Sequence, residues 1–227
     1  MTARRPRRPS LLRFAAVALS ILLGATTLAA QHARLFPPEE LGLLEGPDRD
    51  VWQQPDRIMD ALGIGDGSVV ADLGAGSGWF TIRLARRVGP NGVVYAEDIQ
   101  RQMIEAVDRR VQREGLRNVR TVLGTARDPH LPDGSIDAVL MVDTYWEVEQ
   151  PIELLRKIDR SLKPGGRIGI VDFKRDGGGP GPAMDERSDP GRAIEDARAA
   201  GLDLLSRETF LRYQYMLVFG HAPGHRR

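Results

Sequence analysis

The stretch VVADLGAGSGWF, residues 69–80, joins a short apolar run to a glycine-rich turn and an aromatic pair. The apolar run 69–73 indicates a buried β-strand, and the glycines of 74–78 permit a tight backbone bend. Apolar side chains recur with helical spacing over 80–88. We therefore expect strand, bend and helix, the opening unit of a doubly wound α/β sheet whose ligands bind at the carboxyl ends of its strands.

The same alternation of strands and helices extends along the chain. The pattern predicts further strands over 93–99, 119–123, 136–142, 167–173, 202–207 and 213–219, and helices over 55–62, 101–114, 151–162 and 192–200. Residues 163–166 are typical of a sharp turn, and 174–190 form a Gly/Pro-rich loop. Near-continuous apolar strands between helices predict a mostly parallel sheet covered on both faces.

Composition and charge narrow the function classes. The first 30 residues hold five Arg and no acid, so the remaining chain has 27 basic against 31 acidic residues. A mildly acidic body argues against nucleic acid as a partner. The chain has no Cys and four scattered His, which excludes thiolate sites and argues against a His-built metal site.

The N-terminal residues carry a targeting pattern. An Arg- and Pro-rich start is followed by FAAVALSILLGATTLAA, residues 14–30, which has no charge. This is typical of a secretory signal, or of a membrane anchor if it is not cleaved; a core helix is the alternative. We expect a signal or anchor over 1–30, an extended linker over 31–50 and one domain over 51–221. The domain would be exported, or cytoplasmic if the segment is not a functional signal.

Two features of the bend disfavour a dinucleotide. Trp79 occupies the position where a dinucleotide fingerprint has its third Gly. Asp72, inside the preceding strand, would repel a phosphate and attract an ammonium group. Glu97 and Asp98 end the second strand, where a carboxylate can accept hydrogen bonds from two ribose hydroxyls. The pattern favours a cationic, amino-acid-bearing nucleoside and leaves a nicotinamide oxidoreductase as an alternative.

The chain resembles class I S-adenosylmethionine-dependent methyltransferases. The bend, VVYAEDI (93–99), LPDGSIDAVLMV (131–142) and LKPGGRIGIVDF (162–173) look like successive motifs of that class, over roughly 50–220. The chain is most similar to small-molecule enzymes of the quinone-methylating type and to an exported bacterial branch. The resemblance implies a Rossmann-like seven-stranded sheet with a C-terminal antiparallel hairpin, S-adenosyl-L-methionine as cofactor and a small-molecule acceptor.

The resemblance also implies roles for residues at matching positions. Asp98 would hold the ribose and Ile99 would pack on the adenine, while Thr125 and Ala126 stand where the family often has an Asp at the adenine edge. Asp143 would lie near the methionine end and the acceptor. The residues implied around the methionine part are Asp72, Gly74, Ala75, Gly76 and Gly78.

Candidates for chemistry follow the fourth strand. Methyl transfer from a sulfonium needs mainly alignment, and a base only when the acceptor arrives protonated. Asp143 or Glu147 could take a proton, and Tyr145 and Trp146 could wall an acceptor, so we name Asp143 and Tyr145 as candidate catalytic residues. Trp146 could instead pack a helix on the sheet. A non-catalytic module that binds the cofactor remains an alternative, and neither the acceptor nor the oligomeric state has a signature.

Overall fold

The computed structural model describes residues 35–37, 42, 45–184 and 187–222. The chain divides into two units, Met1–Pro37 and Pro38–Arg227, and the second contains the helices and strands below. The predicted signal or anchor over 1–30 lies outside the described residues. Within the described ranges, no helix combines the length and apolarity needed to cross a bilayer.

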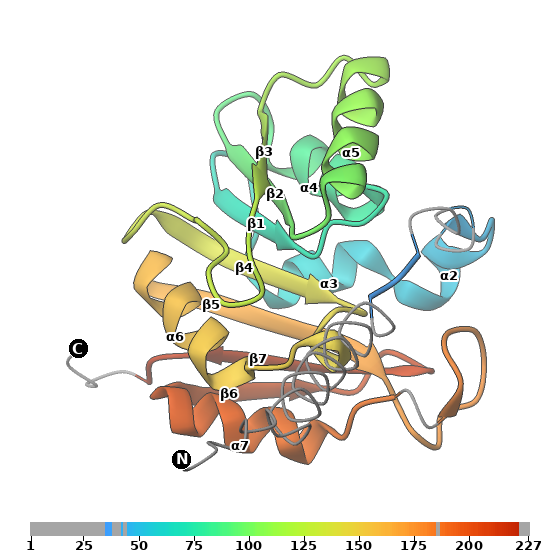
Figure 1. Cartoon of the computed structure of the whole chain (residues 1–227), viewed down its shortest axis with the longest axis vertical. Helices are drawn as coiled ribbons and strands as arrows, with labels where there is room; N and C mark the ends of the chain where they lie inside the picture. Colours follow the sequence, from blue (N-terminus) through green and yellow to red (C-terminus); the bar gives the residue numbers. More distant parts are fainter. Residues whose placement is uncertain (1–34, 38–41, 43–44, 185–186, 223–227) are drawn as a thin grey trace, which may run out of the picture. The chain divides into compact units, whose positions relative to one another are not determined.

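The second unit is built on one seven-stranded sheet (Figure 1). The strand order is β3-β2-β1-β4-β5-β7-β6, and β7 runs antiparallel to both of its neighbours. This confirms the predicted Rossmann-like fold and its C-terminal hairpin. The strands are β1 (Val69–Leu73), β2 (Val93–Asp98), β3 (Val119–Leu123), β4 (Ile136–Val142), β5 (Leu162–Phe173), β6 (Asp203–Glu208) and β7 (Gln214–Gly220).

Helices cover both faces of the sheet, because every strand of its centre is apolar on both sides. Helices α6 and α7 pack on one face, and α3, α4 and α5 pack on the other. A short 3-10 turn, η2, follows β4. The bounds are α2 (Arg49–Gln53), α3 (Pro55–Ala61), α4 (Trp79–Val88), α5 (Arg101–Arg113), η2 (Tyr145–Glu147), α6 (Pro151–Ser161) and α7 (Pro190–Ala200).

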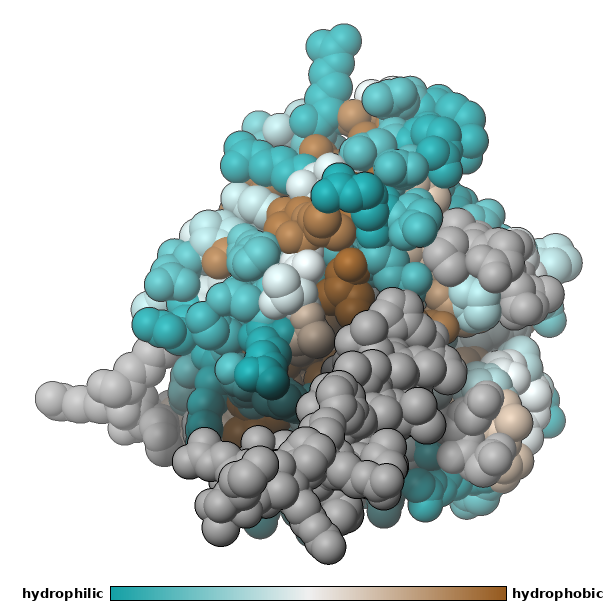
Figure 2. Space-filling view, in the orientation of Figure 1, coloured by the Kyte–Doolittle hydropathy of each residue, from teal (hydrophilic) through white to brown (hydrophobic). Residues whose placement is uncertain are grey.

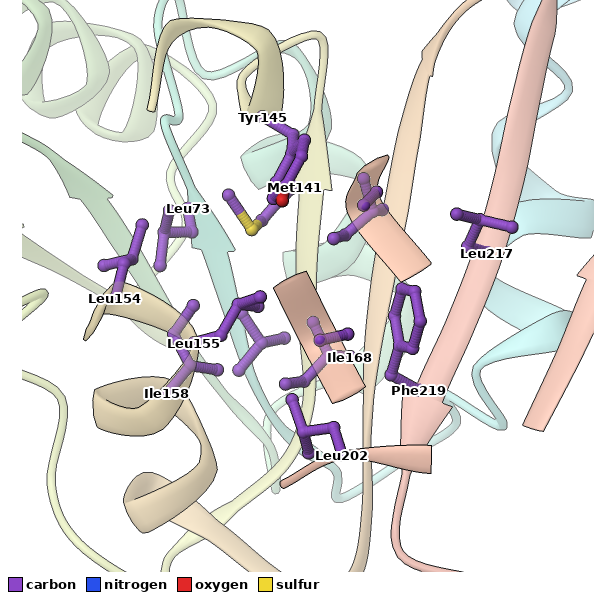
Figure 3. Packing of buried hydrophobic residues seen from close by; sticks show 14 of the residues in the cluster. Leu73, Met141, Tyr145, Leu154, Leu155, Ile158, Ile168, Leu202, Leu217 and Phe219 are labelled. Carbon is purple, nitrogen blue, oxygen red and sulfur yellow. The ribbon is translucent and has the colours of Figure 1, made fainter. Parts of the chain in front are cut away.

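Strand β4 divides the core between the two layers. Met141 belongs to the cluster on the α6 and α7 side, where it lies beside Tyr145 (Figure 3). Leu140 points to the opposite cluster, under α3 and α4. Full burial of each such side chain stabilises the fold by about 1.5–3 kcal/mol. Packing on both faces therefore holds the carboxyl ends of β1 and β4 in place.

The structure differs from the sequence-based expectation in three places. Helix α2 begins at Arg49, inside the predicted linker over 31–50, and the Arg49 side chain is buried. Residues 163–166 lie within β5, where the register with β4 shifts between Ile136 and Ala138. Helix α7 begins at Pro190, two residues early, because the Asp189 side chain accepts a hydrogen bond from the Gly191 N–H and caps it.

Candidate functional site

The glycine-rich bend leaves the carboxyl end of β1, beside the end of β4. Gly74, Gly76 and Gly78 have φ of +72°, +53° and +78°, the left-handed region that favours glycine. A Cβ on Gly74 would lie 2.4 Å from both Cγ2 and Oγ1 of Thr144, just after β4. The bend therefore presses against the end of β4, and only glycine fits at its first position.

The N–H groups of the bend are largely committed within the protein. Those of Gly74 and Ala75 both donate to the carbonyl oxygen of Glu97, at 2.9 Å each. That of Gly76 donates to Oδ2 of Asp98, at 3.0 Å. A phosphate would need these donors for itself. The geometry thus supports the inference that the bend is not a pyrophosphate cradle.

Asp98 lies directly against the bend. Its other carboxylate oxygen accepts the Gln100 N–H at 2.9 Å, and the residue is buried. Burial raises the pKa of Asp98, although the N–H groups of Gln100 and Gly76 oppose the rise. The structure therefore brings the predicted ribose-binding acid and the predicted glycine bend together.

Two further carboxyl groups are buried beside Asp98. Thr81 Oγ1 donates to Oδ2 of Asp72 at 2.6 Å, and burial raises the pKa of Asp72 to about 6. Burial, together with the charges of Asp98 and Asp72, raises the pKa of Glu97 well above its ordinary value. Three acids thus share one poorly solvated region at the ends of β1 and β2.

Ser77 lies within the bend, although the sequence analysis did not single it out. Its Oγ is buried and has no hydrogen-bond partner within the described ranges. A buried hydroxyl without a partner costs about 1–3 kcal/mol. Its place in the bend, between two glycines of positive φ, was the available signal. A ligand with polar atoms at the bend would fit this hydroxyl.

Asp143 stands at the end of β4 in a strained conformation, with φ of +56°. Gln214 Nε2 donates to its Oδ1 at 2.6 Å, and Gln53 Nε2 donates to its Oδ2 at 3.4 Å. Burial raises the pKa of Asp143 to about 6, against the lowering effect of nearby Arg49. Such strain in a non-glycine residue is typical of functional sites and costs on the order of 1–3 kcal/mol.

Asp172, in β5, is a second buried acid near Asp143. Its carboxylate accepts hydrogen bonds from the Phe173 N–H at 2.9 Å, Ser188 Oγ at 3.1 Å and the Trp146 N–H at 3.2 Å. Burial and the charge of Asp143 raise its pKa to about 7. Asp172 is fully buried, so the charge of Asp143 acts on it across a poorly solvated region.

Tyr145 does not join this group of acids. Its ring packs in the core (Figure 3), and its hydroxyl donates to Oδ2 of Asp196 in α7 at 2.6 Å. Burial and Asp196 raise the pKa of Tyr145. We therefore assign this candidate no catalytic role. Trp146 is half-buried, and its indole N–H donates to the carbonyl oxygen of Asp143 at 3.2 Å.

The predicted adenine side lies at the ends of β2 and β3. Ile99 and Leu123 are 37% and 36% exposed, and Thr125 and Ala126 are exposed on the following turn. Figure 2 shows apolar surface near the middle of the drawn face, bordered by hydrophilic residues.

The carboxylate of Asp128, two residues after Ala126, is paired with a lysine of α6. Lys157 Nζ lies 2.7 Å from its Oδ2 and holds the pKa of Asp128 below its ordinary value. The Asp128 carbonyl oxygen accepts the Thr125 N–H at 2.9 Å. Asp128 therefore stabilises the turn after β3.

Helix α2 brings a residue that the sequence analysis did not name. Arg49 is 9% exposed, and its Nη2 lies 3.8 Å from Oδ2 of Asp143. Its guanidinium lies 4.4 Å from the centre of the Trp79 ring, and Asp72 is close enough to raise its pKa. Trp79 itself is buried in the cluster under α3 and α4. The guanidinium of Arg49 therefore packs on a buried aromatic ring.

Comparisons with known proteins show which families this chain resembles. Residues 70–166 match the family described as a methyltransferase domain. A ubiquinone/menaquinone biosynthesis C-methyltransferase of Pasteurella multocida is 36% identical over 131 residues, which are 55% of this chain and 46% of that protein. The chain thus spans about half the length of the curated relative it matches.

Two solved structures share the fold. An S-adenosylmethionine-dependent methyltransferase from Aquifex aeolicus is 26% identical, with a TM-score of 0.78 over 82% of this chain and 98% of that chain. The [4+2]-cyclase SpnF is 24% identical, with a TM-score of 0.59 over 69% of this chain and 58% of that chain. The second likeness concerns the fold alone. The chain is therefore similar to S-adenosylmethionine-dependent methyltransferases, both in the sequence of residues 70–166 and in fold.

Proposed function

We propose that this chain binds S-adenosyl-L-methionine along the glycine bend and transfers its methyl group to a small molecule. One observation supports the proposal. Among the described residues at the ends of β1, β2, β4 and β5, carboxyl side chains outnumber cationic side chains. Arg49 and Arg187 are cations whose charges act on these acids. The acids are Asp72, Glu97, Asp98, Asp143 and Asp172.

A cationic ligand suits such a site. Buried carboxylates are costly unless a positive charge or hydrogen-bond donors meet them. When bound, the cofactor supplies a methyl group on a positively charged sulfur that leaves as a neutral thioether. We expect Asp98 to accept hydrogen bonds from the ribose hydroxyls, and Asp72 to face the amino end. The polar Ser77 hydroxyl suits a ligand that lies along the bend.

For the acceptor we propose a small aromatic molecule of the quinone class. The support is the relative that methylates in quinone biosynthesis and the aromatic group beside Asp143's partner Gln53. In that group, the Trp52 ring lies 5.8 Å from Phe173 and 6.4 Å from Tyr213. Asp143 is the proposed base, because a carboxyl with a pKa of about 6 can take a proton near neutral pH.

Asp98→Ala is expected to weaken binding of S-adenosylhomocysteine at least tenfold, a loss of roughly 1.4 kcal/mol. The variant removes the acceptor for the ribose and for the Gly76 N–H. Isothermal titration calorimetry measures the change, and thermal unfolding shows whether the bend remains folded. Glu105→Ala is the matched control, because it removes an exposed acid from α5 nearby.

Three results would redirect the proposal. Unchanged affinity in Asp98→Ala would refute the site assignment. Displacement of S-adenosylhomocysteine by NADH at comparable concentration would favour a nicotinamide oxidoreductase. Cofactor binding without methyl release, across a broad panel of acceptors including hydroquinones, would favour a non-catalytic binding module.

We also propose that residues 1–30 export or anchor the domain, on the strength of their basic start and uncharged apolar run. Expression of the full chain in a bacterium, followed by fractionation and intact mass measurement, tests this. A periplasmic protein whose mass corresponds to a chain that begins near residue 30 would indicate a cleaved signal peptide. A full-length protein in the membrane fraction would indicate an anchor. The full mass in the cytosol would contradict both.

A further inference from the structure

Residues 45–54, which we call the N-terminal strap, are tied to the domain at several points. Glu45 pairs with Arg110 of α5, and Asp50 accepts three hydrogen bonds from Arg83 of α4, at 2.7, 2.8 and 2.9 Å. Gln53 Nε2 donates to Oε1 of Gln214 in β7 at 3.1 Å. The strap is therefore attached to helices α4 and α5 and to strand β7, and Arg49 lies within the same segment.

The position of Arg49 is costly for an arginine. Burial lowers its pKa, whereas Asp143 and Asp72 raise it. A guanidinium remains charged in proteins, so its desolvation must be offset by nearby groups. The strap has another ion pair on α4 through Asp50 and Arg83, and Arg83 also stacks on the Trp79 ring at 3.4 Å. Attachment of the strap thus has sources other than the Arg49 charge.

The local charges point to the form of ligand that completes the site. Asp72 and Asp143, when ionised, and Arg49 sum to one negative charge. A ligand with only an ammonium group would add a second cation beside Arg49. An amino-acid group adds an ammonium for the carboxylates and a carboxylate for the guanidinium, so every charge gains an opposite neighbour. The planar fork of Arg also matches a carboxylate in geometry.

We propose that Arg49 binds the α-carboxylate of the amino-acid end of the cofactor, and so makes the site selective for the zwitterion. This inference rests on the proposed function. It assigns a specificity role to a residue of the strap, outside the matched residues 70–166.

The test compares three ligands by calorimetry: S-adenosylhomocysteine, its decarboxylated analogue, and 5′-methylthioadenosine, which lacks the amino-acid end. We expect the wild type to bind S-adenosylhomocysteine at least tenfold more tightly than the decarboxylated analogue. In Arg49→Met, which keeps an unbranched stem on Trp79, that ratio should fall to about one. The affinity for 5′-methylthioadenosine should change less than threefold. Arg49→Lys should keep part of the ratio.

Arg83→Met is the matched control. It removes the other guanidinium on the Trp79 ring and its ion pair with Asp50. It therefore weakens the attachment of the strap but leaves Asp72 and Asp143 unchanged. The ratio should persist in this variant. Its collapse there, or equal weakening of all three ligands in Arg49→Met, would show that Arg49 only packs the strap and would overturn the inference.

The two proposals fail in different ways. A wild type that binds none of the three ligands would overturn the proposed function and this inference together. A wild type that binds S-adenosylhomocysteine and its decarboxylated analogue equally well would overturn the inference alone. If Arg49→Met does not fold by circular dichroism, Arg49→Lys and this wild-type ratio still decide the matter.

Discussion

Gly74→Ala is expected to lower the free energy of unfolding by about 2–5 kcal/mol, the sum of a strained backbone and an overpacked contact. The new Cβ would lie 2.4 Å from Thr144 Cγ2 and Oγ1, at a residue with φ of +72°. Relief of the clash would move the bend and disturb its hydrogen bonds to Glu97. Urea unfolding measures the loss, and binding of S-adenosylhomocysteine should fall with it.

Gly67→Ala separates the two causes. Gly67 also has a positive φ, +78°, but a Cβ there would meet no atom within 4 Å. Gly67→Ala should lower the free energy of unfolding by about 1–2 kcal/mol, which is the cost of the backbone strain alone. Adding Thr144→Ala to Gly74→Ala should recover part of the difference, because it removes both clashing atoms. Equal losses in Gly67→Ala and Gly74→Ala would contradict the close contact between the bend and the end of β4.

The free energy of unfolding of the ligand-free protein is expected to fall as pH rises from about 4 to 7. Asp72 and Asp143 have pKa values of about 6 in the fold, and Asp172 has about 7. An unfolded Asp loses its proton near pH 4. Between these values the folded state holds more protons than the unfolded state, so each group lowers stability by roughly 1.4 kcal/mol per pH unit.

Asp172→Asn tests the largest of these three contributions to the pH dependence of stability, because the Asn amide cannot ionise. Unfolding by urea at pH 5, 6 and 7.5 should show a shallower decline for the variant than for the wild type. The comparison of slopes is independent of any change in hydrogen bonds that the amide causes at all pH values. Glu105→Gln, an exposed change, should leave the slope as it is. Parallel slopes in Asp172→Asn and the wild type would show that Asp172 ionises normally in the fold.

Most of the fold could be predicted because its elements have strong local patterns. The apolar run of β1 predicts a strand, and the glycines after it predict a bend. Strand β4 has the same continuous apolar character. Helix α2 was missed because five residues cannot show a helical period. Its residues are held by tertiary contacts, such as Asp50 with Arg83 and Gln53 with Gln214.

The candidate site could be predicted only in part. Asp98 was found because it ends a strand next to the bend in the sheet order. Tyr145 was misjudged because a residue after a strand can turn to the core or to the cleft, and here Asp196 of α7 receives its hydroxyl. Ser77 and Asp172 were not singled out, because only the fold shows that their polar atoms are buried.

The residues alone determined where the chain bends and which acids end its strands, because these depend on backbone freedom and on local apolar runs. Only the tertiary structure decided that Arg49 meets Asp143, which lies 94 positions further along the chain, beside Asp72. The physical reason is that the electrostatic environment of a buried charge depends on distance in space. Contacts between distant segments set those distances, and no local pattern in the sequence encodes them.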